Sequence, residues 1–369
     1  MADLSFLKKI QFPKLKLPFS LGPASYVGID IGSESVKVVQ LRKERERAVL
    51  ETYGELKSPR YFQKEGPQAR GGFLAHLDQN VADLLTDIFR EANVTSRRAV
   101  LAIPATSSFI TVVRLPLLKT EEIASAIPFE AKRYIPIPTS EVALDWQVIE
   151  EDEAEKRVLV LLAAVPHEVV AKFERLAETL KLTLEAVEIE NFSIVRSLLP
   201  ADRGVTAVIQ WGALVTTITV VERRVIRMSH NFGRGGREIT TALSRSLGIT
   251  EERAEAVKRE VGLSEKPEER ETASVISPHV DSALAELERV MLSYNRSAKR
   301  KIEKVVLTGG GANLAGLADH VSRRLGLETA LGNPFARTIF PEFLAPLLKE
   351  IGPNFSVAVG LALRQITPT

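Results

Sequence analysis

Residues 26–41 read Tyr-Val-Gly-Ile-Asp-Ile-Gly-Ser-Glu-Ser-Val-Lys-Val-Val-Gln-Leu, and this stretch predicts a hairpin of two β-strands. Two short runs rich in β-branched residues, Val27–Ile31 and Val36–Leu41, flank a polar turn at Gly32–Ser35. Runs of this length and composition favour strands, and a glycine turn between them favours an antiparallel pair. The stretch therefore predicts a β-sheet at the start of the fold.

The turn of this hairpin has the chemistry of a phosphate-binding site. The polar positions are Asp30 at the end of the first strand, Gly32, Ser33 and Ser35 in the turn, and Lys37 inside the second strand. Free N–H groups, hydroxyls, an ammonium and a carboxylate together suit a metal-bound polyphosphate. The alternative is an ordinary surface hairpin. Neither the P-loop nor the dinucleotide fingerprint is present in this stretch.

A second hairpin is predicted at Ala207–Val221, where two apolar runs flank another glycine turn. When Gly212 is aligned with Gly32, Gln210 falls at the position of the first hairpin's carboxylate. The second turn has lost the polar side chains of the first, because Ala213–Val215 replaces Ser-Glu-Ser. The order and separation of the two copies indicate a chain built from two similar halves.

Length and composition indicate a globular α/β protein of two domains. The 369 residues are 45% apolar and 26% charged, and the net charge of +2 gives no preference for nucleic acid. The chain has no cysteine, which excludes disulfides and thiolate zinc sites. No apolar run is long enough to span a bilayer and the N-terminus lacks an apolar signal core, so we expect a cytoplasmic location.

The predicted parts are a basic and apolar arm at 1–25, a first half at 26–103 and 190–203, a small inserted module at 104–189, and a second half at 204–369 with an outer part at 251–300. We expect an amphipathic helix at 73–92 and a strand at 184–189 that ends the small module. The arm alternates lysines with apolar side chains, so it would contact an anionic membrane surface or pack on its own domain.

Two polar segments of the second half are candidates for ligand contact. Gly235 and Gly236 precede a predicted helix, whose first N–H groups would then face a ligand. Glu255 and Lys258 lie three residues apart and share one face of a predicted helix. The structural alternatives are a plain strand-to-helix loop and a solvated ion pair.

Gly309, Gly310 and Gly311 follow a predicted strand and precede Asn313. Three glycines in a row let a flat ring approach the backbone closely. A tight strand-to-helix turn, the alternative, rarely needs three. This is the second candidate site after the first hairpin.

The ordered set of these motifs resembles the actin-like ATPases from residue 26 to the end of the chain. That family has a duplicated ribonuclease H-like α/β fold. Within it, the sequence is most similar to the PilM family of type IV pilus assembly proteins, which shares a relocated small subdomain with FtsA. The strings that carry this similarity are Glu130–Pro138, Glu141–Asp145, Gly309–Leu317, Asn333–Phe335 and Ile351–Arg364.

The resemblance implies that ATP or ADP binds with Mg²⁺ between the two halves. The expected nucleotide-binding residues are Asp30, Gly32, Ser33, Ser35, Lys37, Gly212, Gly235, Gly236, Glu255, Lys258, Gly309, Gly310, Gly311 and Asn313. Asp30 would place Mg²⁺ through water, Ser33 and Lys37 would hold phosphates, and the three glycines would take the adenine.

The resemblance also implies a partner, the cytoplasmic N-terminal tail of a PilN-like inner-membrane protein. The tail would bind the small module, and the candidate contacts beside its helix are Ile123, Ile127 and Tyr134. The protein would then be a scaffold at the cytoplasmic side of the inner membrane, with no nucleic-acid partner. Self-association is left open.

We expect weak or absent ATP hydrolysis, because Gln210 stands where the family has a carboxylate that positions water and metal. Asn191 or Glu190 could take over that role. One rival interpretation is a small-molecule kinase on the same fold, which would also need the carboxylate. The other is an FtsA-type filament protein, for which we would expect an amphipathic anchor helix in place of the final residues 365–369.

Overall fold

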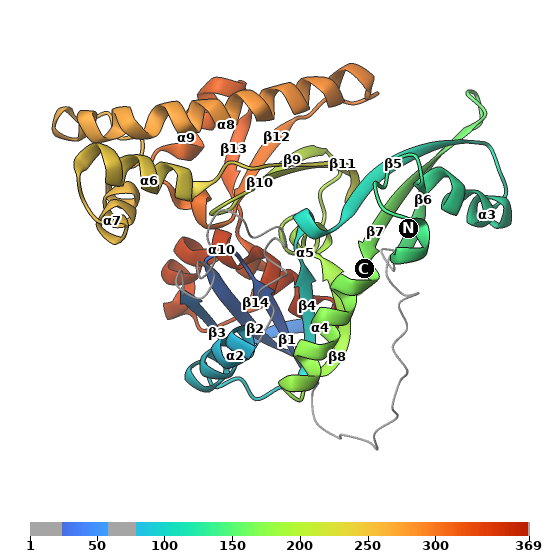
Figure 1. Ribbon diagram of the computed structural model, residues 1–369, viewed down its shortest axis with the longest axis horizontal. Helices are drawn as coiled ribbons and strands as arrows, with labels where there is room; N and C mark the ends of the chain where they lie inside the picture. Colours follow the sequence, from blue (N-terminus) through green and yellow to red (C-terminus); the bar gives the residue numbers. More distant parts are fainter. Residues whose placement is uncertain (1–23, 58–78, 368–369) are drawn as a thin grey trace. The chain divides into compact units, whose positions relative to one another are not determined.

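The computed structural model describes residues 24–57 and 79–367 (Figure 1). The arm predicted at 1–25 lies almost wholly outside these ranges, as does the start of the helix predicted at 73–92. The chain forms two compact units. The first comprises Met1–Leu199, Pro334–Ala345 and Val357–Thr369, and the second comprises Pro200–Asn333 and Pro346–Ser356.

The first unit is built on a six-stranded sheet, whose first three strands along the chain are blue in Figure 1. In spatial order the strands are β14 (Thr338–Ile339), β3 (Arg47–Lys57), β2 (Ser35–Glu44), β1 (Ser25–Ile31), β4 (Arg98–Ile103) and β8 (Thr183–Ile189). The predicted first hairpin is confirmed, since β1 and β2 are antiparallel. Strand β3 is antiparallel to β2, whereas β4 is parallel to β1 and β8 is parallel to β4.

The second unit repeats this pattern in a five-stranded sheet. In spatial order its strands are β11 (Val225–Phe232), β10 (Thr216–Glu222), β9 (Val205–Trp211), β12 (Lys304–Thr308) and β13 (Glu328–Leu331). Strand β10 is antiparallel to both β9 and β11, β12 is parallel to β9, and β13 is parallel to β12. The order and directions match β3-β2-β1-β4-β8, so the predicted duplication is confirmed.

The strand predicted at 184–189 does not belong to the small module. It forms β8, which pairs with β4 along its length as the fifth strand of the first repeat. Its last four residues, Ala186–Ile189, are buried, and a short strand buried in this way needs a large sheet beside it. Helix α4 (His167–Thr179) packs on β8, so it also contacts the large sheet.

The small module therefore contains a three-stranded antiparallel sheet and one helix. Its strands, in spatial order, are β5 (Phe109–Pro116), β7 (Arg157–Pro166) and β6 (Val142–Asp152), and its helix is α3 (Thr120–Ala131). Apolar side chains of α3 and of one face of this sheet form a separate core. Pro128 lies inside α3 without ending it.

The other helices of the first unit are α2 (Gln79–Glu91) and α5 (Glu190–Leu198), and α2 packs on β2 and β3. Those of the second unit are α6 (Gly236–Leu247), α7 (Glu251–Val261), α8 (Arg270–Ser297) and α9 (Leu317–Leu325). Helix α10 (Ala345–Leu363) contributes residues to both units. In the part of the chain that the structure describes, no helix is long and apolar enough to cross a membrane.

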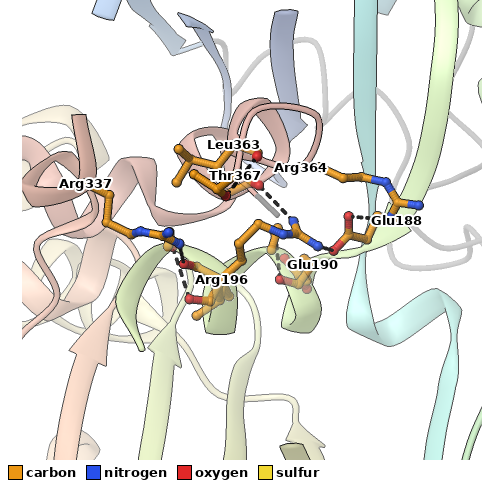
Figure 2. Close-up of polar contacts among 11 residues, drawn as sticks. Glu188, Glu190, Arg196, Arg337, Leu363, Arg364 and Thr367 are labelled. Atoms are coloured by element: carbon orange, nitrogen blue, oxygen red, sulfur yellow. Dashed lines mark hydrogen bonds and ion pairs between the residues drawn. The ribbon is translucent and has the colours of Figure 1, made fainter. Parts of the chain in front are cut away.

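The second half of α10 is fixed tightly within the first unit. A Cβ on Gly28 of β1 would fall 2.7 Å from the backbone nitrogen of Ala362, so glycine is needed where strand and helix meet. A Cβ on Gly360 would overlap the carbonyl oxygen of Ser193 on α5. Figure 2 shows a buried ion-pair network around Glu188 that joins β8 to α5 and to the end of α10. Strand β1, which carries Asp30, thus rests on a closely packed support.

Candidate functional site

The turn of the first hairpin is partly exposed at residues 32–34. The Gly32 N–H donates to the Ser35 carbonyl at 2.9 Å and closes the turn between β1 and β2. The Ser33 hydroxyl has no hydrogen-bond partner among residues 24–57 and 79–367. The Ser35 hydroxyl instead accepts from the Lys37 ammonium at 2.8 Å. The turn therefore presents small residues and one unused hydroxyl beside a lysine.

Three charged side chains lie in a row across the first three strands. The strand register pairs Asp30 with Lys37 and Lys37 with Glu55. Lys37 Nζ lies 3.8 Å from Asp30 Oδ2 and 4.0 Å from Glu55 Oε1, and both Asp30 and Lys37 are buried. Burial raises the pKa of Asp30, the Lys37 charge lowers it, and the Glu55 charge adds to the rise, which is the net direction.

Glu55 is a site residue that the sequence analysis missed. It lies on β3, eighteen positions beyond Lys37, and only the register of β2 against β3 brings the two together. The sequence does not fix the register of β3 against β2, because a second turn separates the two strands. The alternation of β3, in which Glu51 and Glu55 recur at an even spacing, was the available signal.

The charged row fits a magnesium–phosphate group. Within the described residues, no three His, Cys, Asp or Glu side chains are grouped closely enough to hold a metal ion by themselves. Mg²⁺ keeps several waters and takes one or two carboxylates together with substrate phosphates, so Asp30 is a sufficient protein contribution. Bound there, the ion would neutralise phosphate charge, while Lys37 and Ser33 would donate to phosphate oxygens.

The second hairpin has a turn closed in the same way, but the carbonyls of its turn accept hydrogen bonds from helix α6. Its Gly212 N–H donates to the Val215 carbonyl at 3.0 Å, as Gly32 does in the first. The N–H groups of Gly236 and Arg237, however, donate to the Gly212 and Ala213 carbonyls at 3.0 and 2.9 Å. The prediction that these helix N–H groups face a ligand is therefore wrong for the first two, because the hairpin turn caps α6.

Gly235 is required by this capping contact rather than by a ligand. A Cβ on Gly235 would lie 2.7 Å from the Gly212 carbonyl oxygen. At the tip of the same turn the Leu214 side chain is exposed, where a phosphate site would have a polar residue. Gln210 lies at the end of β9, opposite Thr217 of β10 and beside Thr308 of β12.

Glu255 and Lys258 are engaged with each other and with α6. Lys258 Nζ lies 2.5 Å from Glu255 Oε2 and donates to Thr240 Oγ1 at 2.8 Å and to the Gly236 carbonyl at 3.1 Å. Burial would raise the pKa of Glu255, but the Lys258 charge and the hydrogen bonds from Lys258, Thr240 and Arg259 lower it to about 2. The pair joins α7 to the start of α6 in this structure.

Two of the three consecutive glycines are explained by Trp211. A Cβ on Gly309, whose φ is +82°, would lie 2.6 Å from the Trp211 carbonyl oxygen, and one on Gly311 would overlap the indole ring. Gly310 is different, since a Cβ there would meet nothing closer than 3.8 Å, and the residue is exposed. Asn313 is exposed and donates through Nδ2 to the Glu350 carbonyl at 3.1 Å.

The three candidate peptide contacts separate into two kinds. Ile123 and Ile127 are each only 2% exposed and pack in the core of the small module. They are therefore not available as surface anchors, because α3 turns this apolar face toward its own sheet. Tyr134 is 45% exposed, and Phe129 is 69% exposed with the Lys132 ammonium 5.5 Å above its ring.

Two sheets of the same order, each opening with a glycine-turn hairpin, define the duplicated fold of the actin-like ATPases. The family profile described as type IV pilus assembly protein PilM matches residues 28–366. The chain belongs to that family.

Three solved structures resemble this chain at different levels of sequence identity. A solved PilM–PilN type IV pilus biogenesis complex is 25% identical, with a TM-score of 0.78 over 94% of this chain and 100% of that one. The ethanolamine utilization protein EutJ from Carboxydothermus hydrogenoformans is 17% identical, with a TM-score of 0.52 over 93% of this chain and 90% of its own. MreB5 of Spiroplasma citri, solved with AMPPNP, is 11% identical, with a TM-score of 0.50 over 91% and 94%. These last two show the fold alone.

A curated relative links the chain to cell division proteins. FtsA of Rhizobium meliloti (strain 1021) is 31% identical over 180 residues, which are 42% of this chain and 39% of the FtsA chain. The match thus spans well under half of that relative.

Proposed function

We propose that this PilM-family protein is a nucleotide-binding scaffold of a type IV pilus assembly machine. The observation that carries the proposal is the buried Asp30–Lys37–Ser35 group at an open glycine turn. Burying this ammonium and its carboxylate partners costs desolvation free energy, and a lysine at a partly exposed glycine turn suits a phosphate. The similar fold of MreB5, solved with AMPPNP, supports a nucleotide as the ligand.

The phosphate and metal contacts of this proposal all belong to the first unit, and the second unit is described by itself. Asp30 would hold Mg²⁺ through water, while Ser33 and Lys37 would bind phosphate oxygens. In the second unit, Gly310 leaves room for a ring to approach the backbone. Glu255 is held ionised by its low pKa and could accept from a ribose hydroxyl. The capped turn at Gly212 and Gly235 would serve as support for these groups.

The same residues favour slow hydrolysis. An attacking water must be oriented and polarised on the far side of the γ-phosphate. Gln210 is neutral, and the second turn offers Ala213 and an exposed Leu214 where hydroxyl or charged groups would be needed. Glu190 is an unsuitable substitute here because its carboxylate already accepts from the Ala105 N–H at 2.7 Å. The bound nucleotide would then act as a structural ligand.

Calorimetric titration of ATP with Mg²⁺ into wild type and Lys37→Ala tests the nucleotide site. Loss of one charge-assisted phosphate contact should weaken binding by about tenfold or more. Lys43→Ala is the matched control, because Lys43 lies on the same strand at the end remote from the turn. Equal affinity of wild type and Lys37→Ala, with both folded by thermal unfolding, would reject the assignment.

We further propose that the cytoplasmic tail of a PilN-like inner-membrane protein docks on the small module. The support is the fold shared with the protein solved as a PilM–PilN complex, and two exposed aromatic side chains, Phe129 and Tyr134, on one short segment. Exposed aromatics are frequent anchors at interfaces. This association would place the protein beside the inner membrane.

The docking site is tested by pull-down with an immobilised tail peptide. Phe129→Ser combined with Tyr134→Ser should abolish capture, because both aromatic anchors are lost while the core residues Ile123 and Ile127 remain. Leu331→Ser, which alters an exposed apolar residue of the second unit, is the control. Undiminished capture by the double variant would exclude this surface. Deletion of 104–189 is unsuitable, since it would remove β8 from the large sheet.

A further inference from the structure

Glu55 lies 4.0 Å from Lys37, the lysine that we propose binds phosphate. Lys37 lies between two carboxylates in the register, Asp30 on β1 and Glu55 on β3. The exposed fraction of the side chain is 11% for Lys37, 12% for Asp30 and 21% for Glu55. All three charges therefore act on one another in a partly desolvated setting, where screening by water is weak.

The charge balance of this row is unfavourable for a bare polyphosphate. Two carboxylates and one ammonium leave one negative charge in excess when all are ionised. The Ser35 hydroxyl, at 2.8 Å from Lys37 Nζ, adds a further acceptor that competes for the ammonium. A phosphate that approaches Lys37 must displace these partners and also overcome the repulsion of Glu55. A divalent cation carried by the phosphate neutralises part of the phosphate charge and so reduces this repulsion.

We propose that Glu55 makes nucleotide binding conditional on a divalent cation. It is a positioning residue whose carboxylate lies 4.0 Å from the Lys37 ammonium, and its charge disfavours metal-free nucleotide. This inference rests on the proposed nucleotide site and adds the form of nucleotide that the site selects. The selection comes from a strand that the phosphate-hairpin motif does not include.

The expected effect is a change in a ratio of affinities. Wild type should bind ADP with Mg²⁺ far more tightly than ADP with a chelator. Removing a like charge about 6 Å from a bound phosphate changes the affinity about tenfold at an effective dielectric constant of about 40, between the values for protein and water. Glu55→Gln should therefore strengthen binding of metal-free ADP by about tenfold. The affinity for Mg–ADP should rise less, so the ratio of Mg–ADP affinity to metal-free ADP affinity should fall by a similar factor.

The test is calorimetric titration of ADP into folded protein, once with Mg²⁺ and once with a chelator. Glu55→Asp keeps the charge but shortens the side chain, so it should keep the wild-type ratio of affinities. If the ratio depended on side-chain packing alone, Glu55→Asp would change it as well. Glu51→Gln removes a carboxylate from the same strand, where it pairs with Arg42 and Gln40, and should also leave the ratio unchanged. If Glu55→Gln does not fold, the shift should appear in Glu55→Ala.

Three results separate the possible failures. A ratio in Glu55→Gln equal to that of wild type would overturn the inference and leave the nucleotide site intact. A ratio that falls equally in Glu51→Gln or Glu55→Asp would also overturn it, because the effect would not belong to the charge at position 55. Absence of ADP binding by wild type in both conditions would overturn the proposed nucleotide site and this inference with it.

Discussion

Replacing Glu188 by Gln should severely destabilise the first unit. Glu188 lies fully buried on β8, where Oε1 is 2.7 Å from Arg196 Nη2 and Oε2 is 2.9 Å from Arg364 Nη1. Arg196 also donates to the Gly360 carbonyl at 2.8 Å, and Arg337 donates to the Arg196 carbonyl (Figure 2). One carboxylate thus compensates two guanidinium groups that join β8, α5 and α10.

The magnitude follows from what the substitution leaves behind. Removing one partner of a buried ion pair costs about 3–5 kcal/mol, since the other charge stays buried without compensation. Here one arginine is almost completely buried and the other is 16% exposed, so the loss should fall at the upper end of that range. Gln can still accept a hydrogen bond, and it therefore isolates the role of charge from that of shape.

The substitution also changes the dependence of stability on pH. Burial would raise the pKa of Glu188, but the charges and hydrogen bonds of Arg196 and Arg364 outweigh it and hold the pKa below its ordinary value of 4.5. A carboxylate with a lowered folded-state pKa stabilises the fold above its unfolded pKa, and that stability is lost as the pH falls through the folded pKa. Glu188→Gln should remove this part of the acid destabilisation.

Urea unfolding followed by tryptophan fluorescence measures the effect. The chain has two tryptophans, Trp146 on β6 of the small module and Trp211 in the second unit, so far-UV circular dichroism is recorded in parallel to follow the strands and helices around Glu188. Glu185→Gln is the control, because Glu185 is on the same strand but pairs with a 46% exposed Arg98. An exposed pair contributes about 1 kcal/mol or less. Equal losses in the two variants would refute the reasoning.

Two further predictions concern the second unit. Gly311→Ala should force the Trp211 indole to move and lower the free energy of unfolding by about 1–3 kcal/mol. Gly326→Ala, at a position with a left-handed backbone and open space around it, is the control for backbone strain. An unchanged Trp211 emission spectrum in Gly311→Ala would contradict the packing. Phosphate release at saturating ATP should be about 10²-fold slower than in an actin-like ATPase that keeps the carboxylate, and Gln210→Glu should raise the rate. The role of Gln210 would be contradicted if the wild-type protein turned over ATP as fast as that ATPase and Gln210→Ala left the rate unchanged.

The sequence predicts those parts of the fold that depend on local patterns. Both hairpins and the duplication follow from short β-branched runs around glycine turns, and the structure confirms them. The strand at 184–189 was misplaced because it directly follows the small module along the chain. Its partner β4 lies some eighty residues earlier, and only comparison of the two repeats identifies it as the counterpart of β13.

The candidate site shows a similar division between local and distant contacts. The sequence places Asp30 and Lys37 on the two strands of one hairpin, and the antiparallel register of the structure brings them opposite each other. Glu55 was missed because its approach depends on a second turn and on the register of β3. The triple glycine predicts ligand contacts at Gly309 and Gly311, yet the structure gives both a structural reason in Trp211, which comes from the hairpin nearly a hundred residues earlier.

The two hairpins show why one backbone geometry supports different chemistry. Both turns are closed by the same hydrogen bond, at 2.9 Å in the first and 3.0 Å in the second. In the second, the carbonyls of Gly212 and Ala213 accept from α6, and polar side chains at the tip would add nothing to that contact. In the first, Ser33 has no hydrogen-bond partner among the described residues, and Lys37 is held by acceptors that a phosphate can replace. Loss of polar residues from the second turn is therefore expected once the turn supports a helix, and the ligand chemistry that remains is concentrated on β1, β2 and β3.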